Sequence, residues 1–300
     1  MNSLKTEPSA FMNCQLFYVH DEQQAQVKSL QALITENHLP IALNAERFAD
    51  KLTQKRRQQL SQISANPMLL IDDKNTLSWL SNGLSVAPEW DKLQRRVVNA
   101  GRKSELLLQA AKITSDSIAI DATAGFGHDS LILASTGAQV IMLEQQPIVA
   151  LLLLAEQQRM SVLPNWQKLM RRLTIVNADA LTYFANLQSS EIKDNKQNKI
   201  KKIDMVYLDP MFPEDSFQDS KTGKGAKVGK HMQALHQLAR PPTLAEEMQL
   251  LQSAQAIVSQ SSQKQGRVIV KRPQFAPLLA NSSPNESWHN EAVRFDGYFV

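Results

Sequence analysis

The sequence predicts an α/β protein in which helices cover both faces of a mostly parallel, seven-stranded sheet, with a small α+β domain preceding it. Two observations support this fold class. From about Ser104 onward, nearly continuous apolar runs alternate with helical segments, a pattern typical of parallel strands buried on both faces. Residues 1–100 lack this alternation, and a chain of 300 residues is long enough for about two domains. We therefore predict a small first domain over 1–100 and a larger α/β domain over 101–300.

Three segments define the first domain. Residues 15–20, "QLFYVH", favour a short strand. Residues 21–38 place apolar side chains at helical intervals and acids in the first turn, which predicts a helix. Residues 68–80 contain two apolar runs around a polar turn, which predicts a β-hairpin.

In the second domain, glycine and proline mark several ends of the predicted elements. Gly137 closes one helix, Pro210 ends a strand, and Pro147 lies near a first helical turn, where its missing N–H does no harm. Predicted helices cover 105–113, 129–137, 147–160 and 243–260. Predicted strands cover 117–123, 139–145, 173–179, 203–210, 266–273 and 291–300, the last of them paired with residues around 286–289.

The composition excludes several classes of protein. Cys14 is the only cysteine, so neither an intramolecular disulfide nor a cysteine-based zinc cluster can form. The six histidines show no metal-ligand spacing, and we expect no metal. The longest apolar run, residues 148–155, is far shorter than the roughly 20 residues that span a bilayer. The N-terminus lacks the pattern of a secretory signal, so we expect a cytoplasmic protein with no membrane partner.

Basic residues gather in four short segments, although the formal net charge is only +4. The segments are 51–57, 92–103, 196–202 and 221–230, and the last contains four lysines and no acid. A single basic run is usually a solvated face. Four of them favour a polyanionic partner, because each cation that neutralises a phosphate releases counterions.

Asp121, Gly125, Gly127 and Glu144 indicate a ligand-binding loop. In an open parallel sheet, ligands bind beyond the carboxyl ends of the strands at the topological switch point, where these residues would lie. The glycines allow a tight turn and a close approach of the backbone to a ligand. An acid at the end of the second strand can accept hydrogen bonds from two ribose hydroxyls. The loop predicts a nucleoside-containing cofactor, although a βα turn without a ligand fits the same spacing.

The place of Asp121 favours one class of cofactor. It stands four residues ahead of Gly125, in a D-x-x-x-G-x-G pattern that resembles the first motif of S-adenosylmethionine-dependent methyltransferases. Asp179, at the end of the third strand, can accept from an adenine amino group, with room beside the ring at Ala180. An N-cap for the following helix is an equally compatible role for Asp179.

The segment "VYLDPMFP", residues 206–213, is the most specific signal in the chain. It resembles the [DN]-P-P-[FYW] motif of enzymes that methylate exocyclic amino nitrogens of nucleobases. The Asp209 carboxylate and the Pro210 carbonyl can accept hydrogen bonds from such an amine, and Phe212 can stack on the base. Met211 replaces the second proline and is expected on the substrate side. A plain strand-ending turn is the alternative, since Asp-Pro is a common turn signal.

Several motifs in the same order extend this resemblance. "DATAGFGHDS", "VYLDPMFP" with the lysine-rich segment after it, and "VIVKRP" resemble the RsmJ family of 16S rRNA guanine-N2 methyltransferases, from about Met68 to the C-terminus. The resemblance implies a Rossmann-like, class I methyltransferase domain with S-adenosylmethionine as its cofactor. By position it implies cofactor contacts at His128, Asp129, Glu144, Gln145, Asp179, Ala180 and Asp209. The family has arginine where His128 and Gln145 stand, and two serines where Asp179 and Ala180 stand.

Basic side chains near the predicted site are assigned to RNA. Lys271 and Arg272, at the end of the fifth strand, can hold phosphates or the edge of the target base, with plain surface charge as the alternative. Lys221 and Lys224 of the lysine-rich segment are assigned to the same footprint. The predicted function is methylation of guanine N2 in 16S rRNA or the small ribosomal subunit, by a monomer. The alternatives are an adenine-N6 methyltransferase, a nicotinamide-dependent oxidoreductase and a catalytically idle RNA-binding protein.

Overall fold

The structure is a computed structural model that describes residues 11–48, 53–63, 66–101, 103–193, 202–212, 230–259 and 265–300. The chain divides into two compact units: Met1–Ala87 with Pro147–Ala155, and Pro88–Gln146 with Glu156–Val300. The predicted domain boundary at residue 100 stays a prediction. In the part of the chain that is described, no helix combines the length and the hydropathy needed to cross a membrane.

The first unit contains a five-stranded sheet in the order β2-β1-β3-β4-β5. Strand β1 is parallel to its two neighbours, β2 and β3, whereas β3, β4 and β5 are antiparallel neighbours. The elements are β1 (Met12–Tyr18), α1 (Gln24–Glu36), β2 (Ile41–Arg47), α2 (Gln54–Ile63), β3 (Met68–Ile71), β4 (Leu77–Ser81) and β5 (Leu84–Val86). The predicted strand, helix and hairpin are confirmed. Sequence reasoning missed β2, an edge strand whose last four residues are exposed and which therefore lacks a buried apolar run.

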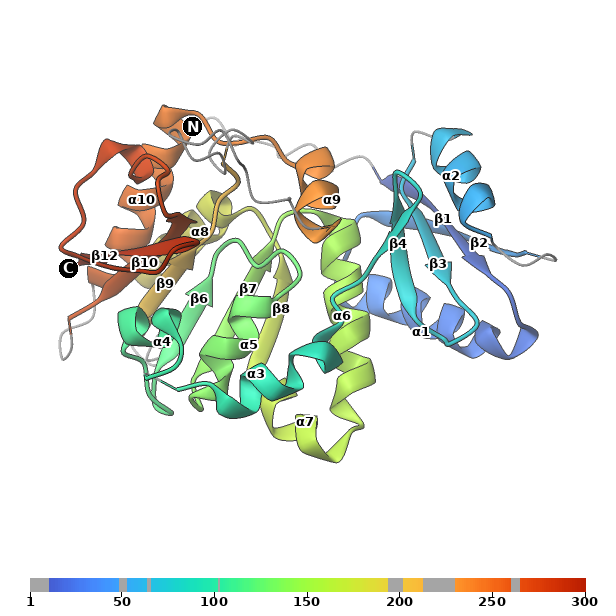
Figure 1. Ribbon diagram of the computed structural model, residues 1–300, viewed down its shortest axis with the longest axis horizontal. Coiled ribbons are helices and arrows are strands. Elements are labelled where there is room, and N and C mark those ends of the chain that lie inside the picture. Colours follow the sequence, from blue (N-terminus) through green and yellow to red (C-terminus); the bar gives the residue numbers. More distant parts are fainter. Residues whose placement is uncertain are drawn as a thin grey trace. The chain divides into compact units, whose positions relative to one another are not determined.

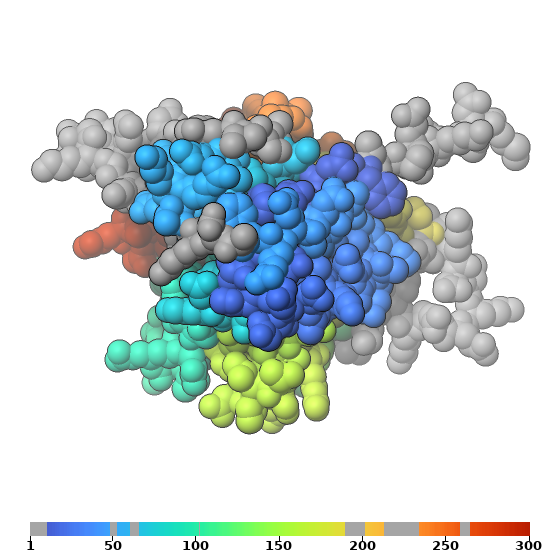
Figure 2. All heavy atoms as spheres, turned by 90° about the vertical axis from the view of Figure 1, so that its right-hand side faces the viewer, coloured from blue at the N-terminus to red at the C-terminus, as the bar shows by residue number. Residues whose placement is uncertain are grey.

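Helix α2 carries part of the first basic segment on the surface of this unit (Figure 2). Lys55 and Arg56 are exposed, whereas Arg57 is half-buried and donates a hydrogen bond to the Ser85 hydroxyl at 3.1 Å. Two cationic side chains on this helix therefore face solvent.

The second unit is built on a seven-stranded sheet in the order β11-β12-β10-β9-β6-β7-β8 (Figure 1). Strands β10, β9, β6, β7 and β8 are parallel, and β12 and β11 add an antiparallel edge. The strands are β6 (Ile118–Asp121), β7 (Gln139–Glu144), β8 (Leu173–Asn177), β9 (Met205–Leu208), β10 (Arg267–Pro273), β11 (Glu286–His289) and β12 (Val293–Phe299). The predicted seven-stranded, mostly parallel sheet is confirmed, including the strand pair at the C-terminus.

The helices of this unit include three that the sequence reasoning missed: α3, α7 and α9. The helices are α3 (Gln94–Asn99), α4 (Leu106–Ala111), α5 (His128–Ser135), α7 (Pro164–Met170), α8 (Ala180–Lys193), α9 (Lys230–Leu238) and α10 (Leu244–Ser259), and α6 (Pro147–Ser161) is shared by the two units. Helices α8 and α10 pack on one face of the sheet, and α4 and α5 pack on the other (Figure 1).

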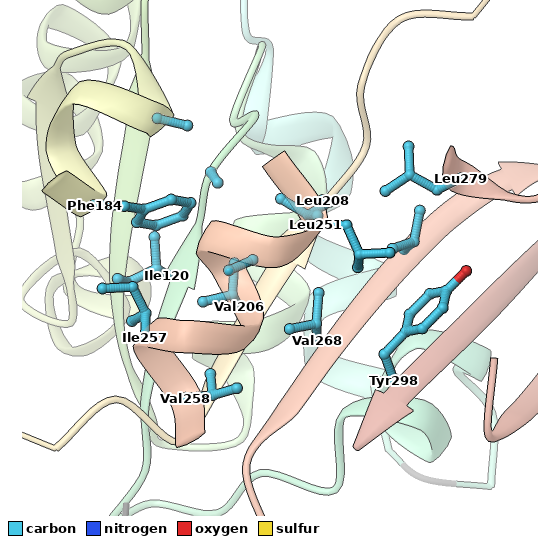
Figure 3. Close-up of a cluster of buried hydrophobic side chains, with 14 of the residues drawn as sticks. Ile120, Phe184, Val206, Leu208, Leu251, Ile257, Val258, Val268, Leu279 and Tyr298 are labelled. Carbon is cyan, nitrogen blue, oxygen red and sulfur yellow. The ribbon is translucent and has the colours of Figure 1, made fainter. Parts of the chain in front are cut away.

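The core between the sheet and the α8–α10 pair explains why one set of strand residues is apolar (Figure 3). Phe184 of α8 and Ile257 of α10 pack in one cluster with Ile120, Val206 and Val268 from three neighbouring strands. Because side chains alternate along a strand, the residues next to these three face α4 and α5. This alternation decides which polar side chains of neighbouring strands can meet on each face of the sheet.

Replacing Phe184 by alanine is expected to lower the free energy of unfolding by about 3–5 kcal/mol, because the ring leaves a cavity in this core. Phe184 is only 1% exposed, whereas Phe11 is 70% exposed and serves as the control. Chemical denaturation of both alanine variants measures the difference. An equal loss in the two variants would contradict the assigned packing.

The strand order places a topological switch point between β6 and β9. The chain runs from β6 to β7 and β8 on one side, then returns to the other side of β6 with β9. Ligands of open α/β sheets bind in the crevice outside the carboxyl ends of the strands at such a point. The residues that follow β6 and β9 are therefore the first candidates for a site.

Candidate active site

A cavity of about 420 Å³ lies at the carboxyl ends of β6, β7, β8 and β9. Its volume falls in the range of about 300–1,000 Å³ that is usual for small-molecule sites. The predicted residues that line it are Gly125, Glu144, Gln145, Asp179, Ala180, Asp209, Pro210 and Met211. Residues of four separate strand ends thus share one cavity.

Helix α9 and the start of α10 supply a wall of this cavity that the sequence reasoning did not foresee. Leu235 and Leu238 line the cavity from α9, and Leu250 lines it from α10. The Gln146 side chain, after β7, donates to the Leu238 carbonyl at 3.2 Å. Residues 230–238 mix polar and apolar positions, so an amphipathic helix could have been predicted from them.

The loop after β6 takes the backbone conformation that glycine permits. Gly125 and Gly127 have φ of 51° and 76°, and Gly127 is the N-cap of α5. Asp121 stabilises this loop with two hydrogen bonds: its carboxylate accepts from the Thr123 N–H at 3.2 Å and from the Ser130 hydroxyl at 2.5 Å. Burial raises the pKa of Asp121 to about 7. Asp121 is buried and does not line the cavity, so its predicted cofactor contact stays a prediction.

Glu144 ties the end of β7 to the glycine loop. Its two carboxylate oxygens accept from the Gly125 N–H at 3.0 Å and from the Gln146 N–H at 2.7 Å. Burial raises the pKa of Glu144 to about 7. Each oxygen keeps a second lone pair for a ligand hydroxyl. Asn177, which the sequence reasoning missed, supports this end of β7 by donating to the Glu144 and Gln145 carbonyls at 2.8 and 3.1 Å.

Asp179 caps α8 and lines the cavity at the same time. Its Oδ1 accepts from the backbone N–H and the hydroxyl of Thr182 at 2.9 and 3.0 Å. The N-cap role is therefore present, and it leaves the predicted contact with a cofactor open. Ala180 begins α8 beside it.

A row of charged side chains stands behind the end of β9. The Lys271 ammonium lies 2.9 Å from Asp209 Oδ2 and 2.8 Å from Asp129 Oδ2, and the Tyr207 hydroxyl donates to Asp129 Oδ2 at 2.8 Å. The Asp209 N–H donates to the Thr123 hydroxyl at 2.6 Å. Within the described residues, Asp209 Oδ1 is a buried oxygen without a hydrogen-bond partner. An acceptor with no protein donor thus stands at the strand end.

Burial and charge act in opposite directions on the pKa values of this row. Burial is the main reason that the pKa of Asp209 is raised, and Lys271 opposes it. For Asp129, burial raises the pKa, but the Lys271 ammonium and the Tyr207 hydroxyl lower it by more, so that the pKa is about 2. For Lys271, burial lowers the pKa, and the two carboxylates raise it by more, so the amine stays charged.

The remaining predicted residues do not line the cavity. Arg272 is 4% exposed and its guanidinium donates to Glu247 of α10, so its predicted RNA contact gains no support from this placement. Strand neighbours point to opposite faces, which is why Lys271 reaches the site and Arg272 does not. The Phe212 ring is 5% exposed, and its predicted stacking stays a prediction. The His128 ring bonds the Pro88 carbonyl at 2.8 Å through Nε2, and burial lowers its pKa.

Lys221 and Lys224 lie outside the described residues. Over the described ranges, no group of three or more histidine, cysteine, aspartate or glutamate residues could hold a metal ion. The acceptors at Glu144 and Asp179, the glycine backbone and the cavity volume fit the S-adenosylmethionine that the sequence resemblance implies.

Comparison with known proteins agrees with this geometry. Residues 46–300 match the SAM-dependent methyltransferase family (SAM_MT). Ribosomal RNA small subunit methyltransferase J of Psychrobacter arcticus is 73% identical to this chain over 300 residues, the full length of both. The protein of the same name from Acinetobacter baumannii is 37% identical over 238 residues, 78% of this chain and 79% of that one.

A solved SAM-dependent methyltransferase from Neisseria gonorrhoeae shares the fold, with a TM-score of 0.63 and 23% identity over 95% of each chain. The predicted fold class and the predicted family are both confirmed by these matches. The chain therefore belongs to the ribosomal RNA small subunit methyltransferase J family of SAM-dependent methyltransferases.

Proposed function

We propose that this protein methylates the exocyclic N2 of a guanine in the 16S RNA of the small ribosomal subunit. The names of its relatives supply the substrate class, ribosomal RNA of the small subunit. The observation that carries the chemistry is Asp209 Oδ1, a buried acceptor at the end of β9 that has no donor among the residues the structure describes. An amino group is a ligand that such an acceptor can bind.

The proposed roles follow from where each group lies. Glu144 would hold the ribose hydroxyls of S-adenosylmethionine, and Asp179 its adenine amino group, while the glycine loop lets the backbone approach. When bound, S-adenosylmethionine supplies an electrophilic methyl group, so no covalent nucleophile is required of the protein.

The residues after β9 would act on the amine. The lone pair of a guanine amino group is delocalised into the ring, which makes the nitrogen a poor nucleophile. Asp209 Oδ1 and the Pro210 carbonyl would accept its two N–H bonds and hold the nitrogen in line with the methyl group. The proton leaves afterwards through Asp209 or to solvent.

Methyl transfer from labelled S-adenosylmethionine to small-subunit RNA that lacks the modification tests the proposal. Naked RNA and assembled subunits are assayed separately, and mass mapping of the product identifies the base and the atom. We expect one methyl group on N2 of one guanine. A methyl group on adenine N6 would support the alternative nucleobase. No incorporation into either substrate would contradict the proposal.

Phe275 is proposed as a stacking surface for RNA, in addition to the predicted lysines 221 and 224. It follows β10 and is 74% exposed. The turn that carries it is fixed by Arg294, which donates to the Gln274 and Ala276 carbonyls at 2.9 and 3.1 Å and is paired with the buried Asp296. An exposed aromatic ring on a rigid turn is suited to stacking on an unpaired base.

Replacing Phe275 by alanine is expected to weaken RNA binding by about 10-fold, because one base–aromatic stack is worth about 1–3 kcal/mol. The Phe275→Tyr variant keeps a ring and is expected to bind normally. Fluorescence anisotropy with labelled RNA at fixed salt measures both. Equal affinity of the alanine variant and the unmodified protein would remove Phe275 from the footprint.

We further propose that the protein works in the cytoplasm, because ribosomal RNA is its proposed substrate, and that it works as a monomer. Sedimentation velocity tests the second point, and a stable dimer at assay concentrations would contradict it.

A further inference from the structure

We propose that Lys271 is a positioning residue of the active site: its ion pairs with Asp129 and Asp209 occupy Asp209 Oδ2 and hold Oδ1 toward the substrate amine. The inference rests on the proposed function for the identity of that amine. It gives Lys271 a role different from the RNA contact predicted from the sequence.

Strand register explains why these side chains meet. Asp121 pairs with Tyr207 across β6 and β9, and Tyr207 pairs with Ile269 across β9 and β10. Asp209 and Lys271 lie two residues farther along the same two strands, so their side chains return to the same face. That face is covered by α5, whose first turn supplies Asp129. The charged row is therefore built into the sheet.

The charge balance of this face depends on Lys271. Three buried or half-buried carboxylates gather there, those of Asp121, Asp129 and Asp209. Arg96 reaches Asp129 Oδ1 only at 4.0 Å and is committed to Glu105 through two hydrogen bonds of 2.9 Å. Among the described residues, Lys271 is thus the cation in hydrogen-bond contact with two of the three carboxylates. Charges removed from water in this way need a partner to stay ionised.

A phosphate contact is a poorer use of this ammonium group. Two of its three protons point to carboxylates in ion pairs of 2.8 and 2.9 Å. A phosphate that approached the third would also meet the negative charge of Asp129 and Asp209. Holding the carboxylates is therefore the role that the contacts support.

Several titratable groups surround Lys271 and can contribute to the pH dependence of activity. They are Asp121 of β6, Tyr207 and Asp209 of β9 and its end, His128 and Asp129 of α5, Arg96 of α3 and Arg272 of β10. His128 has a lowered pKa, and Tyr207 a raised one, so both are neutral around pH 7. Asp129, with a pKa of about 2, stays ionised, whereas the charge of Asp121, with a pKa of about 7, varies near neutrality.

Two substitutions should move the same pH profile in opposite directions. The amine acceptor must be ionised, so activity is lost as the pH falls through the pKa of Asp209. Lys271→Met removes the ammonium and raises that pKa, so the acidic limb of kcat moves up by about one pH unit or more. Asp129→Asn removes a like charge and leaves Lys271 to Asp209 alone, so the limb moves down.

The experiment measures kcat from pH 5.5 to 9 with S-adenosylmethionine and saturating small-subunit RNA. At pH 7, Lys271→Met is expected to lower kcat by about 10²-fold, while the KM for RNA and its salt dependence change little. Lys271→Arg keeps the charge and should recover part of the loss. Lys168→Met removes an exposed lysine of α7 and is the control.

A carbon-13 NMR titration of the Asp209 carboxyl, assigned with Asp209→Asn, gives a readout that needs no methyl transfer. If Lys271→Met does not fold, Asp129→Asn and Lys271→Arg still decide the question. Shifts of opposite sign support the proposal even if ribosomal RNA is not the substrate. An unmoved Asp209 titration, or a Lys271→Met variant that changes only the KM for RNA and its salt slope, would overturn it.

Discussion

Replacing Asp209 by alanine is expected to lower kcat by about 10³-fold or more, since it deletes the oxygen that would grip the amine in the transition state. The dissociation constant of S-adenosylmethionine should rise far less, by under about 10-fold, because the cofactor contacts proposed for Glu144 and Asp179 lie at the ends of β7 and β8. Single-turnover methyl transfer measures the first quantity and calorimetry the second.

Two further variants are compared with Asp209→Ala. Asp116→Ala removes an exposed aspartate of the same unit and controls for the general effect of a lost charge. Asp209→Asn keeps the shape of the side chain and one carbonyl oxygen, so it should be less damaged than the alanine variant. Near-normal turnover in Asp209→Ala would refute the assigned role, whatever the cofactor affinity.

Replacing Glu144 by alanine is expected to weaken S-adenosylmethionine binding by about 10²-fold, since each unsatisfied buried group costs about 1–3 kcal/mol. The change removes the acceptor for the Gly125 and Gln146 N–H groups and the proposed acceptor for the ribose hydroxyls. Calorimetric titration with S-adenosylhomocysteine measures the loss, and Glu291→Ala, at an exposed glutamate, is the control. Unchanged affinity would separate Glu144 from the cofactor.

The pKa of Glu144 predicts the direction in which cofactor affinity changes with pH. Burial raises the pKa of Glu144 to about 7, so part of the population is protonated near neutrality and cannot accept two ribose hydroxyls. Cofactor affinity should therefore increase as the pH rises from 6 to 8. Because this pKa is raised, Glu144 in the folded state keeps a proton that it has released in the unfolded state. The free energy of unfolding should therefore fall as the pH rises from about 4.5 to about 7.

Measuring cofactor affinity over the same pH range in the unmodified protein and in Glu144→Ala isolates the contribution of Glu144. The cofactor's own titrating groups contribute equally to both series, and Asp121, which also has a pKa of about 7, is present in both. The slope contributed by Glu144 should disappear in Glu144→Ala. An identical slope in the variant would assign the pH dependence elsewhere.

Sequence patterns predicted the parts of the fold that depend on neighbours in the chain. Apolar runs such as 139–145 and 203–210 became β7 and β9, and the turn after Asp121 became a glycine loop with positive φ. The elements that the sequence patterns did not predict lie in segments without a buried apolar pattern. The edge strand β2 and helix α9 were both missed, although α9 forms a wall of the cavity.

The sequence by itself determined that acidic residues end the strands of a parallel sheet, because apolar periodicity and the residues that stop a strand are local properties. Only the tertiary structure decided which of them act together. Asp129 and Lys271 are 142 positions apart, and they meet because the strand register puts Lys271 on the face that α5 covers. Arg272, one residue later, turns to α10, since neighbouring side chains on a strand point in opposite directions. Contacts of this kind depend on register and face, which no short stretch of sequence specifies.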